Sequence, residues 1–92
     1  MIPTHRVPAH PGEILLEEFL NPRKIQQTTL AAHLKVPVQR INELVNGKRG
    51  VTPETAWLLA AALETTPEFW MNLQVQHDLA KHRLETPLKA IR

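Results

Sequence analysis

Two short segments near the middle of the chain, joined by a tight turn, constrain its fold more than any other feature. Residues Gln27 to Leu34 carry a short helical pattern, and a second one follows within Val36 to Gly47. Two short helices joined in this way are typical of a helix-turn-helix, whose second helix enters the DNA major groove. Residues 27–47 therefore predict a chain that reads double-stranded DNA and is not an enzyme.

Positive charge is concentrated on and around this motif. Between Arg23 and Arg49 there are six basic residues and a single acid, Glu43, whereas the rest of the chain has five basic and eight acidic residues. Neutralising DNA phosphates releases counterions and supplies the sequence-independent part of affinity. Most charge clusters are merely solvated surface, but a cluster on a helix-turn-helix favours phosphate contact.

The N-terminal part predicts an arm followed by one helix. Pro3 and Pro8 indicate an extended arm over residues 1–10, and Pro11 suits the first turn of a helix because its missing N–H has no partner there. Apolar residues recur at helical spacing after it, and Pro22 ends the pattern. With 92 residues, we expect one domain over residues 1–92.

The C-terminal half predicts two further helices. Thr52-Pro53-Glu54 and Thr66-Pro67-Glu68 each supply a capping hydroxyl, a proline at the first position and an early acid. We expect the first of these helices to reach about Glu64 and to bury Ala56, Leu59, Ala60 and Leu63, and the second to reach about Leu84. The predicted fold is all-α, with five helices and short loops.

Composition argues against several other classes of protein. The chain has no cysteine, so it has neither disulfides nor thiolate metal sites. Its apolar runs are too short to span a bilayer, and its first residues lack the apolar segment of a secretory signal, which favours a cytoplasmic protein. His77 and His82 do not have the spacing of two zinc ligands on one helix face. No nucleophile motif or phosphate-binding loop is present, and we expect no cofactor, no metal and no membrane partner.

Helical geometry selects the residues expected to meet DNA. Ile41, Leu44 and Val45 share one face of the second helix of the motif and should pack on the neighbouring second and fourth helices of the fold. The other side carries the residues predicted to read bases, namely Gln39, Arg40, Asn42, Glu43 and Asn46. Gln39 suits adenine, because an amide can both donate to and accept from it. The predicted phosphate contacts are Gln27, Thr28, Lys35, Lys48 and Arg49.

A chain that reads DNA with a single recognition helix is expected to form a dimer. One recognition helix reads only a half-site, and two helices related by symmetry are spaced about one DNA turn apart. Residues 67–92 are predicted to form a dimerisation helix and tail, with Trp57, Trp70 and Leu73 at the interface, because two tryptophans are a large apolar area for so small a core.

Several segments together resemble the HigA family of antitoxins, within the lambda-repressor-like (Xre) helix-turn-helix superfamily. They are His10-Pro11-Gly12-Glu13-Ile14-Leu15, Glu18-Phe19-Leu20, Leu30-Ala31, Val36, Asn46-Gly47, Thr52-Pro53-Glu54 and Glu68-Phe69-Trp70 with Asn72-Leu73-Gln74. The resemblance implies a homodimer that binds a palindromic operator, represses its own operon and neutralises a RelE-like toxin that cleaves messenger RNA.

The chain departs from the family pattern at three positions. Lys24 and Lys35 stand where glycine is common, and Pro37 replaces the usual hydroxyl cap of the recognition helix. A left-handed lysine costs roughly 1 kcal/mol, so either the turns are reshaped or that cost is accepted for added positive charge.

Two alternatives to an antitoxin remain open. One is a stand-alone Xre-type transcriptional regulator without a toxin partner. The other is a protein-interaction module that has lost DNA binding, for which Glu43 and the two lysine-substituted turns are the hints.

Overall fold

The computed structural model describes residues 8–91, and these form five helical segments without a strand. The elements are α1 (Pro11–Ile14), which continues directly as the π-helix η1 (Leu15–Leu20), then α2 (Gln27–Leu34), α3 (Val38–Val45), α4 (Pro53–Leu63) and α5 (Pro67–Lys81). The predicted all-α fold is confirmed. Residues 1–7 of the predicted arm lie outside the described residues, and residues 8–10 are not helical.

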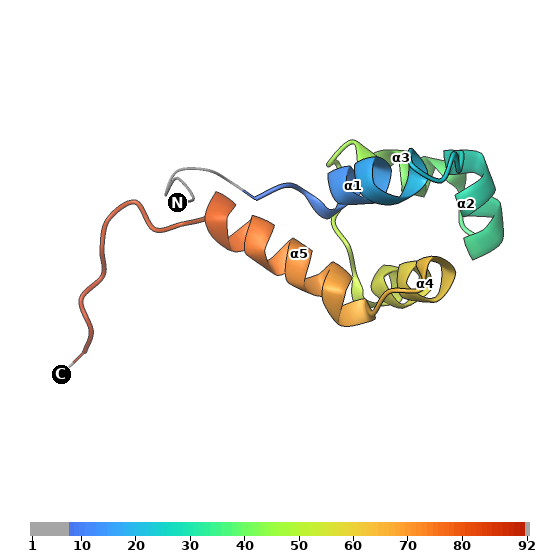
Figure 1. Ribbon diagram of the computed structural model, residues 1–92. Helices are drawn as coiled ribbons and strands as arrows, with labels where there is room; N and C mark the ends of the chain where they lie inside the picture. The colour runs from blue at the N-terminus through green and yellow to red at the C-terminus, as the bar shows by residue number, and fades with distance from the viewer. Residues whose placement is uncertain (1–7, 92) are drawn as a thin grey trace.

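Figure 1 shows how the helices are arranged. α1 and α3 lie side by side, α4 lies on the opposite side of the body, and α2 stands at the end away from the termini. α5 packs on α4 near its own start and then projects away from the body. None of the helices in the described part of the chain is both long enough and apolar enough to cross a membrane.

The core forms where η1, α3, α4 and α5 meet. Its largest fully buried side chains include Leu15, Ile41, Leu59 and Trp70. The four α4 residues predicted to be buried are all in this core. Trp70 has an exposed fraction of 0%, and its Nε1 donates a hydrogen bond of 2.7 Å to Thr65 Oγ1. The prediction that Trp70 lies at a dimer interface is therefore wrong, because the domain already covers the whole indole and satisfies its N–H.

Helix α3 is held by a direct backbone contact with α1. A Cβ placed on Gly12 would lie 1.7 Å from the carbonyl oxygen of Leu44, so only glycine allows the two helices to come this close. The main partners of α3 are α2 and α1. The predicted packing on α2 is confirmed, and α1 is a further partner. Side chains of α3 and α4 share one buried cluster, with Ile41 and Leu44 from α3 and Leu59 from α4.

The first helix differs in form from the prediction. It ends at Leu20, just before Pro22, but after Ile14 its turns widen to a π-helix. The N–H of Asn21 bonds the carbonyl of Leu16 at 2.9 Å, five residues back. The wider turn helps to bring Leu15 and Leu20, five residues apart, into the same buried core.

Four helices end in the same left-handed turn, and three of these turns lack glycine. The left-handed residues are Lys24, Lys35, Gly47 and Glu64, with φ of 54°, 59°, 73° and 57°. In each case the next residue donates its N–H to a carbonyl five residues back, as Val36 does to Ala31 at 3.0 Å. Lys24 and Lys35 thus keep the turn geometry that glycine would adopt, at a cost of roughly 1 kcal/mol each.

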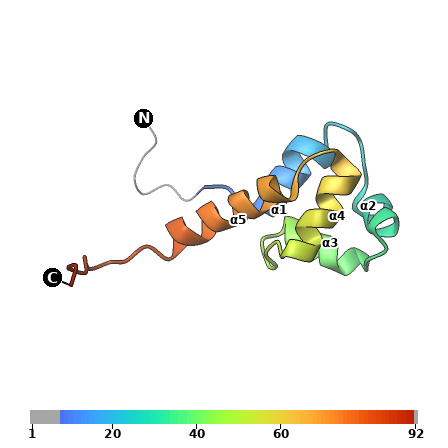
Figure 2. The ribbon, with the colours of Figure 1, turned by 90° about the horizontal axis from the view of Figure 1, so that it is seen from below.

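The last helix is shorter than predicted. α5 ends at Lys81, not near Leu84, and residues 82–91 are all exposed. No burial offsets the entropy of ordering another turn there, and Pro87 favours an extended residue before it. Figures 1 and 2 show this segment running away from the body as an extended tail.

A buried glutamine links α5 to the segment that follows α3. Gln74 is only 9% exposed, and its Oε1 accepts a 2.7 Å hydrogen bond from the N–H of Val51. Its Nε2 donates to Asp78 Oδ1 at 2.9 Å. The loop after α3 is thereby fixed to α5 by a bond that solvent does not reach.

A pair of histidines ties the start of α1 to α5. His10 Nδ1 accepts a 2.9 Å bond from the N–H of Gly12 and so caps α1, and its ring meets His77 edge to face with centroids 5.0 Å apart. His77 Nδ1 lies 2.8 Å from the carbonyl oxygen of Pro8. Burial, followed by the neighbouring His77, lowers the pKa of His10.

Candidate nucleic-acid interface

The outer face of α3 is polar, as its periodicity predicts. Ile41 and Leu44 are buried, whereas Gln39, Asn42 and Asn46 are exposed. Pro37 precedes the helix and provides no side-chain cap. Amide side chains on one exposed helix face offer both donors and acceptors, which is the chemistry of base-edge recognition in the major groove.

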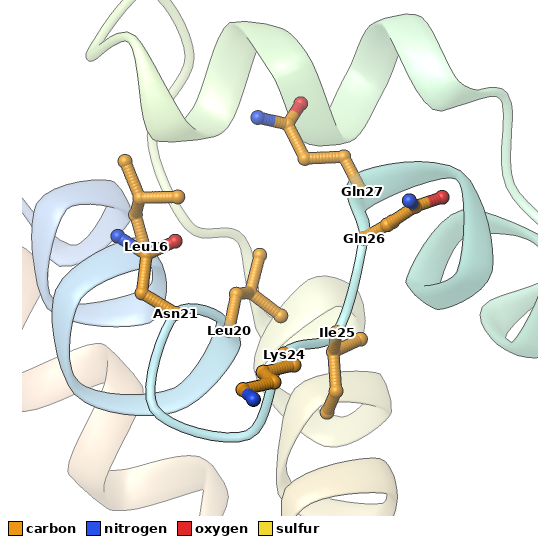
Figure 3. Close-up of a pocket in the computed structure, with 7 residues that line it drawn as sticks. All are labelled: Leu16, Leu20, Asn21, Lys24, Ile25, Gln26 and Gln27. Atoms are coloured by element: carbon orange, nitrogen blue, oxygen red, sulfur yellow. The ribbon is translucent and has the colours of Figure 1, made fainter.

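One set of amides joins α3 to the start of α2. Asn42 Nδ2 donates to Gln27 Oε1 at 3.4 Å, and Asn46 Nδ2 donates to Asn42 Oδ1 at 3.2 Å. Figure 3 shows the side chain of Gln27 directed toward α3. A predicted phosphate contact and two predicted base readers therefore form one hydrogen-bonded row across the motif.

A second set of hydrogen bonds surrounds Glu43, the single acid between Arg23 and Arg49. Arg49 donates to Glu43 Oε1 from Nη2 at 2.9 Å and from Nε at 3.1 Å, and Gln39 Nε2 donates to Glu43 Oε2 at 3.4 Å. Glu43 is half-buried, whereas Gln39 and Arg49 are exposed. The carboxylate thus neutralises one cation and holds the amide beside it.

The start of α2 lies beside a shallow hollow. No side chain caps this helix, so backbone N–H groups of its first turn lack a side-chain acceptor. Thr28 Oγ1 contacts Gln26 Oε1 at 3.5 Å. The hollow, drawn in Figure 3, is lined by Leu16, Leu20, Asn21, Lys24, Ile25, Gln26 and Gln27. An uncapped helix start with a lysine nearby suits a phosphate oxygen.

The remaining basic side chains are distributed unevenly. Lys48 and Arg49 follow α3 directly and are exposed. Arg40 forms an ion pair with Glu54 of α4, in which the distance from Nη1 to Oε1 is 3.6 Å. Lys35 stands apart from both hydrogen-bonded sets, because it lines a hollow with residues of α4 such as Leu58 and Ala61. Of the predicted phosphate contacts, Gln27 and Arg49 belong to the two hydrogen-bonded sets, whereas Thr28, Lys35 and Lys48 do not.

Comparison with known proteins assigns this arrangement to a family. The helix-turn-helix family model matches residues 16–70. The antitoxin HigA-1 of Vibrio cholerae is 46% identical over 77 residues, which is 83% of this chain and 71% of that protein. The chain belongs to the HigA family.

Two further relatives extend the comparison. The solved structure of the Pseudomonas aeruginosa antitoxin HigA with the higBA promoter matches with a TM-score of 0.78 and 37% identity, over 88% of this chain and 99% of that one. An uncharacterized HTH-type transcriptional regulator of Haemophilus influenzae is 45% identical over 80% of this chain and 69% of its own length. This HigA-family chain spans about two thirds of the length of the curated relatives it matches.

Two of the three residues predicted to lie at a dimer interface are accessible on the surface of the domain. In this HigA-family chain, Trp57 on α4 is 66% exposed and Leu73 is half-buried, while Trp70 is in the core. The apolar side chains that α5 leaves exposed are Phe69, Val75 and Leu79, and the tail adds Leu84, Leu88 and Ile91.

Sequence reasoning missed the pairing of Glu43 with Arg49. The signal was present in Asn46-Gly47, because the left-handed turn at Gly47 returns the chain toward α3, and the N–H of Lys48 bonds the Glu43 carbonyl at 2.8 Å. An acid in the last turn before such a glycine and an arginine just after it are therefore brought together. The capping role of His10 was missed as well, since histidine is not among the preferred caps.

Proposed function

We propose that this chain is the antitoxin of a toxin–antitoxin pair, that it binds a palindromic operator as a homodimer to repress its own operon, and that it neutralises a RelE-like, mRNA-cleaving toxin by direct contact. The observation that carries the DNA-binding part is the amide-rich face of α3, continued by Lys48 and Arg49. The family membership and the promoter-bound relative support the same role.

The residues divide between two tasks. Gln39, Asn42 and Asn46 read base edges from the exposed face of α3, with Arg40 at its margin. Gln27, Thr28, Lys35, Lys48 and Arg49 contact phosphates. Phosphate contacts set the register of the protein on DNA, while base contacts select the sequence.

A gel shift with the DNA upstream of the chain's own gene tests the proposal, with shuffled DNA of equal length as control. We expect a band that is specific for the upstream DNA and weakens steeply with salt. Absence of any specific band at low salt would overturn the repressor role and leave the interaction-module alternative.

Two substitutions distinguish base reading from phosphate contact. Gln39→Ala should lose discrimination worth about 1–3 kcal/mol, whereas Lys48→Ala should weaken binding to all sequences and lower the salt slope by about one. Equal losses from both variants on specific and shuffled DNA would contradict the division.

Dimer formation is proposed to use α5 and the tail. Val75 and Leu79 on α5 are exposed at helical spacing, and the tail residues beyond α5 carry further exposed leucines. Sedimentation of the wild-type chain against Val75→Glu/Leu79→Glu tests this contact. A wild-type monomer at micromolar concentration would refute it, as would a double variant that still dimerises.

Toxin binding separates an antitoxin from a stand-alone regulator. The regulator alternative is favoured by relatives described only as HTH-type transcriptional regulators. Co-expression of the chain with the product of the neighbouring reading frame should give a stable complex and restore growth that the neighbour alone arrests. If the neighbour is not toxic and does not co-purify, the stand-alone regulator is the better description.

A further inference from the structure

Glu43 sits among the predicted base readers, yet its contacts give it a different task. We propose that Glu43 is a positioning residue: it orients the amide of Gln39 to read the operator and holds the guanidinium of Arg49 beside it for contact with a phosphate. The inference rests on the proposed DNA binding and names which side chains determine specificity within it.

Both carboxylate oxygens of Glu43 accept hydrogen bonds from side chains of the protein itself. Oε1 accepts two N–H groups of Arg49 at 2.9 and 3.1 Å, and Oε2 accepts the Gln39 amide at 3.4 Å. A carboxylate that read cytosine would present an open oxygen to the groove. Glu43 instead directs its acceptors to its own neighbours, and it is less exposed than either of them.

The contact with Glu43 leaves Gln39 with the groups that recognition of adenine needs. A glutamine amide has two N–H donors and one acceptor oxygen. One N–H points to Glu43, which selects one of the two orientations of the amide plane. The second N–H and Oε1 remain for the paired contact with adenine, so less rotational freedom is lost on binding.

Arg49 is held in the same way. Its guanidinium has five donors, and the bonds from Nε and Nη2 to Glu43 use two of them. The remaining donors suffice for a paired contact with a phosphate. The side chains of Arg49 and Glu43 are 48% and 31% exposed, so the ion pair adds little to folding stability, and its effect is on geometry.

Three substitutions at position 43 distinguish the positioning of Gln39 and Arg49 from the effect of the negative charge alone. Glu43→Asp keeps the charge but shortens the side chain, so that it no longer spans Gln39 and Arg49 together. Glu43→Gln removes the charge and keeps the length, and Glu43→Ala removes both. Glu68→Gln on α5 is the matched control, because Glu68 is an exposed acid that takes part in neither ion pair of the described residues.

The measurement is the ratio of affinities for the chain's upstream DNA and shuffled DNA, as a function of salt, with thermal unfolding to show that each variant is folded. We expect Glu43→Asp to lower the ratio roughly tenfold with an unchanged salt slope. Glu43→Gln and Glu43→Ala should lower the ratio as well, bind shuffled DNA more tightly and steepen the salt slope by about one. Glu68→Gln should leave the ratio unchanged.

A further pair of variants tests whether the effect passes through Gln39. In a Gln39→Ala background, Glu43→Asp should lower the ratio much less than in the wild type. If Glu43→Asp keeps full discrimination, or if its loss is undiminished without Gln39, positioning of Gln39 is refuted while DNA binding stands. If the wild-type chain itself fails to discriminate, it is the proposed function that fails.

Discussion

The contact between α1 and α3 predicts a large loss of stability from the smallest possible substitution. In Gly12→Ala the new Cβ would lie 1.7 Å from the Leu44 carbonyl oxygen, 2.5 Å from its carbon and 2.9 Å from Val45 Cα. A carbon and a carbonyl oxygen approach to about 3.3 Å, so the helices must separate by roughly 1.6 Å. All three obstructing atoms are backbone, and rotamer changes cannot remove the clash.

The expected magnitude follows from this geometry. Overpacking costs about 1–3 kcal/mol when side chains relax, and a backbone clash belongs at the upper end, about 3 kcal/mol. For a domain of this size each kcal/mol lowers Tm by roughly 4–8 °C. We therefore expect a Tm about 12–24 °C lower, together with weaker DNA binding at temperatures where the variant is folded, because α3 is displaced.

Urea unfolding and a thermal scan measure the effect, and Gly50→Ala is the matched control. A Cβ at Gly50 would meet only side-chain atoms of Gln74, at 3.0 Å from Oε1, and a movement of that side chain by a few tenths of an ångström relieves the contact while stretching its bond to Val51. That variant should lose about 1 kcal/mol or less. If Gly12→Ala were as stable as Gly50→Ala, the reasoning about the α1–α3 contact would be refuted.

Three further predictions concern single side chains. Lys35→Gly should raise the free energy of unfolding by about 0.5–1 kcal/mol in urea, because its φ of 59° strains any residue with a Cβ; an unchanged midpoint would argue against that strain. Gln74→Leu should lower the free energy of unfolding by about 1–3 kcal/mol, because the buried N–H of Val51 loses its acceptor. An unchanged free energy of unfolding would show that the bond between Gln74 and Val51 does not stabilise the link to α5. The pKa of His10 is lowered below its ordinary 6.5, so the neutral ring is favoured in the folded state: stability is full above pH 6.5 and falls as the pH drops through the lowered pKa. His10→Asn, which retains a capping oxygen, should flatten this part of the profile of stability against pH. An unaltered profile would show that another group causes the loss of stability.

Much of the fold follows from local signals. Proline and threonine at helix starts, the glycine after α3 and the apolar period of α4 each act within a few residues, so they can be recognised in the sequence. The outer face of α3 was predictable for the same reason: burial of Ile41 and Leu44 on one side determines which side chains lie on the other.

The features that the sequence did not reveal depend on contacts between distant segments. Whether Trp70 is an interface residue or a core residue depends on whether Phe19 and Thr65 reach it, and both do. The close approach of α1 to α3 depends on a single glycine, Gly12, which periodicity cannot indicate. The pairing of Glu43 with Arg49, six residues apart, is the exception, because its signal was the left-handed turn at Gly47 that returns the chain toward α3.

The bond between Gln74 and Val51 has a consequence for the size of operator that the protein accepts. It joins α5, the proposed contact between subunits, to the loop that leads out of α3. In a dimer paired through α5, the separation of the two recognition helices is then set by a short, buried connection and not by a flexible linker. Such a dimer tolerates little variation in the number of base pairs between half-sites, and inserting or removing one base pair at the centre of the operator should abolish simultaneous binding of both halves.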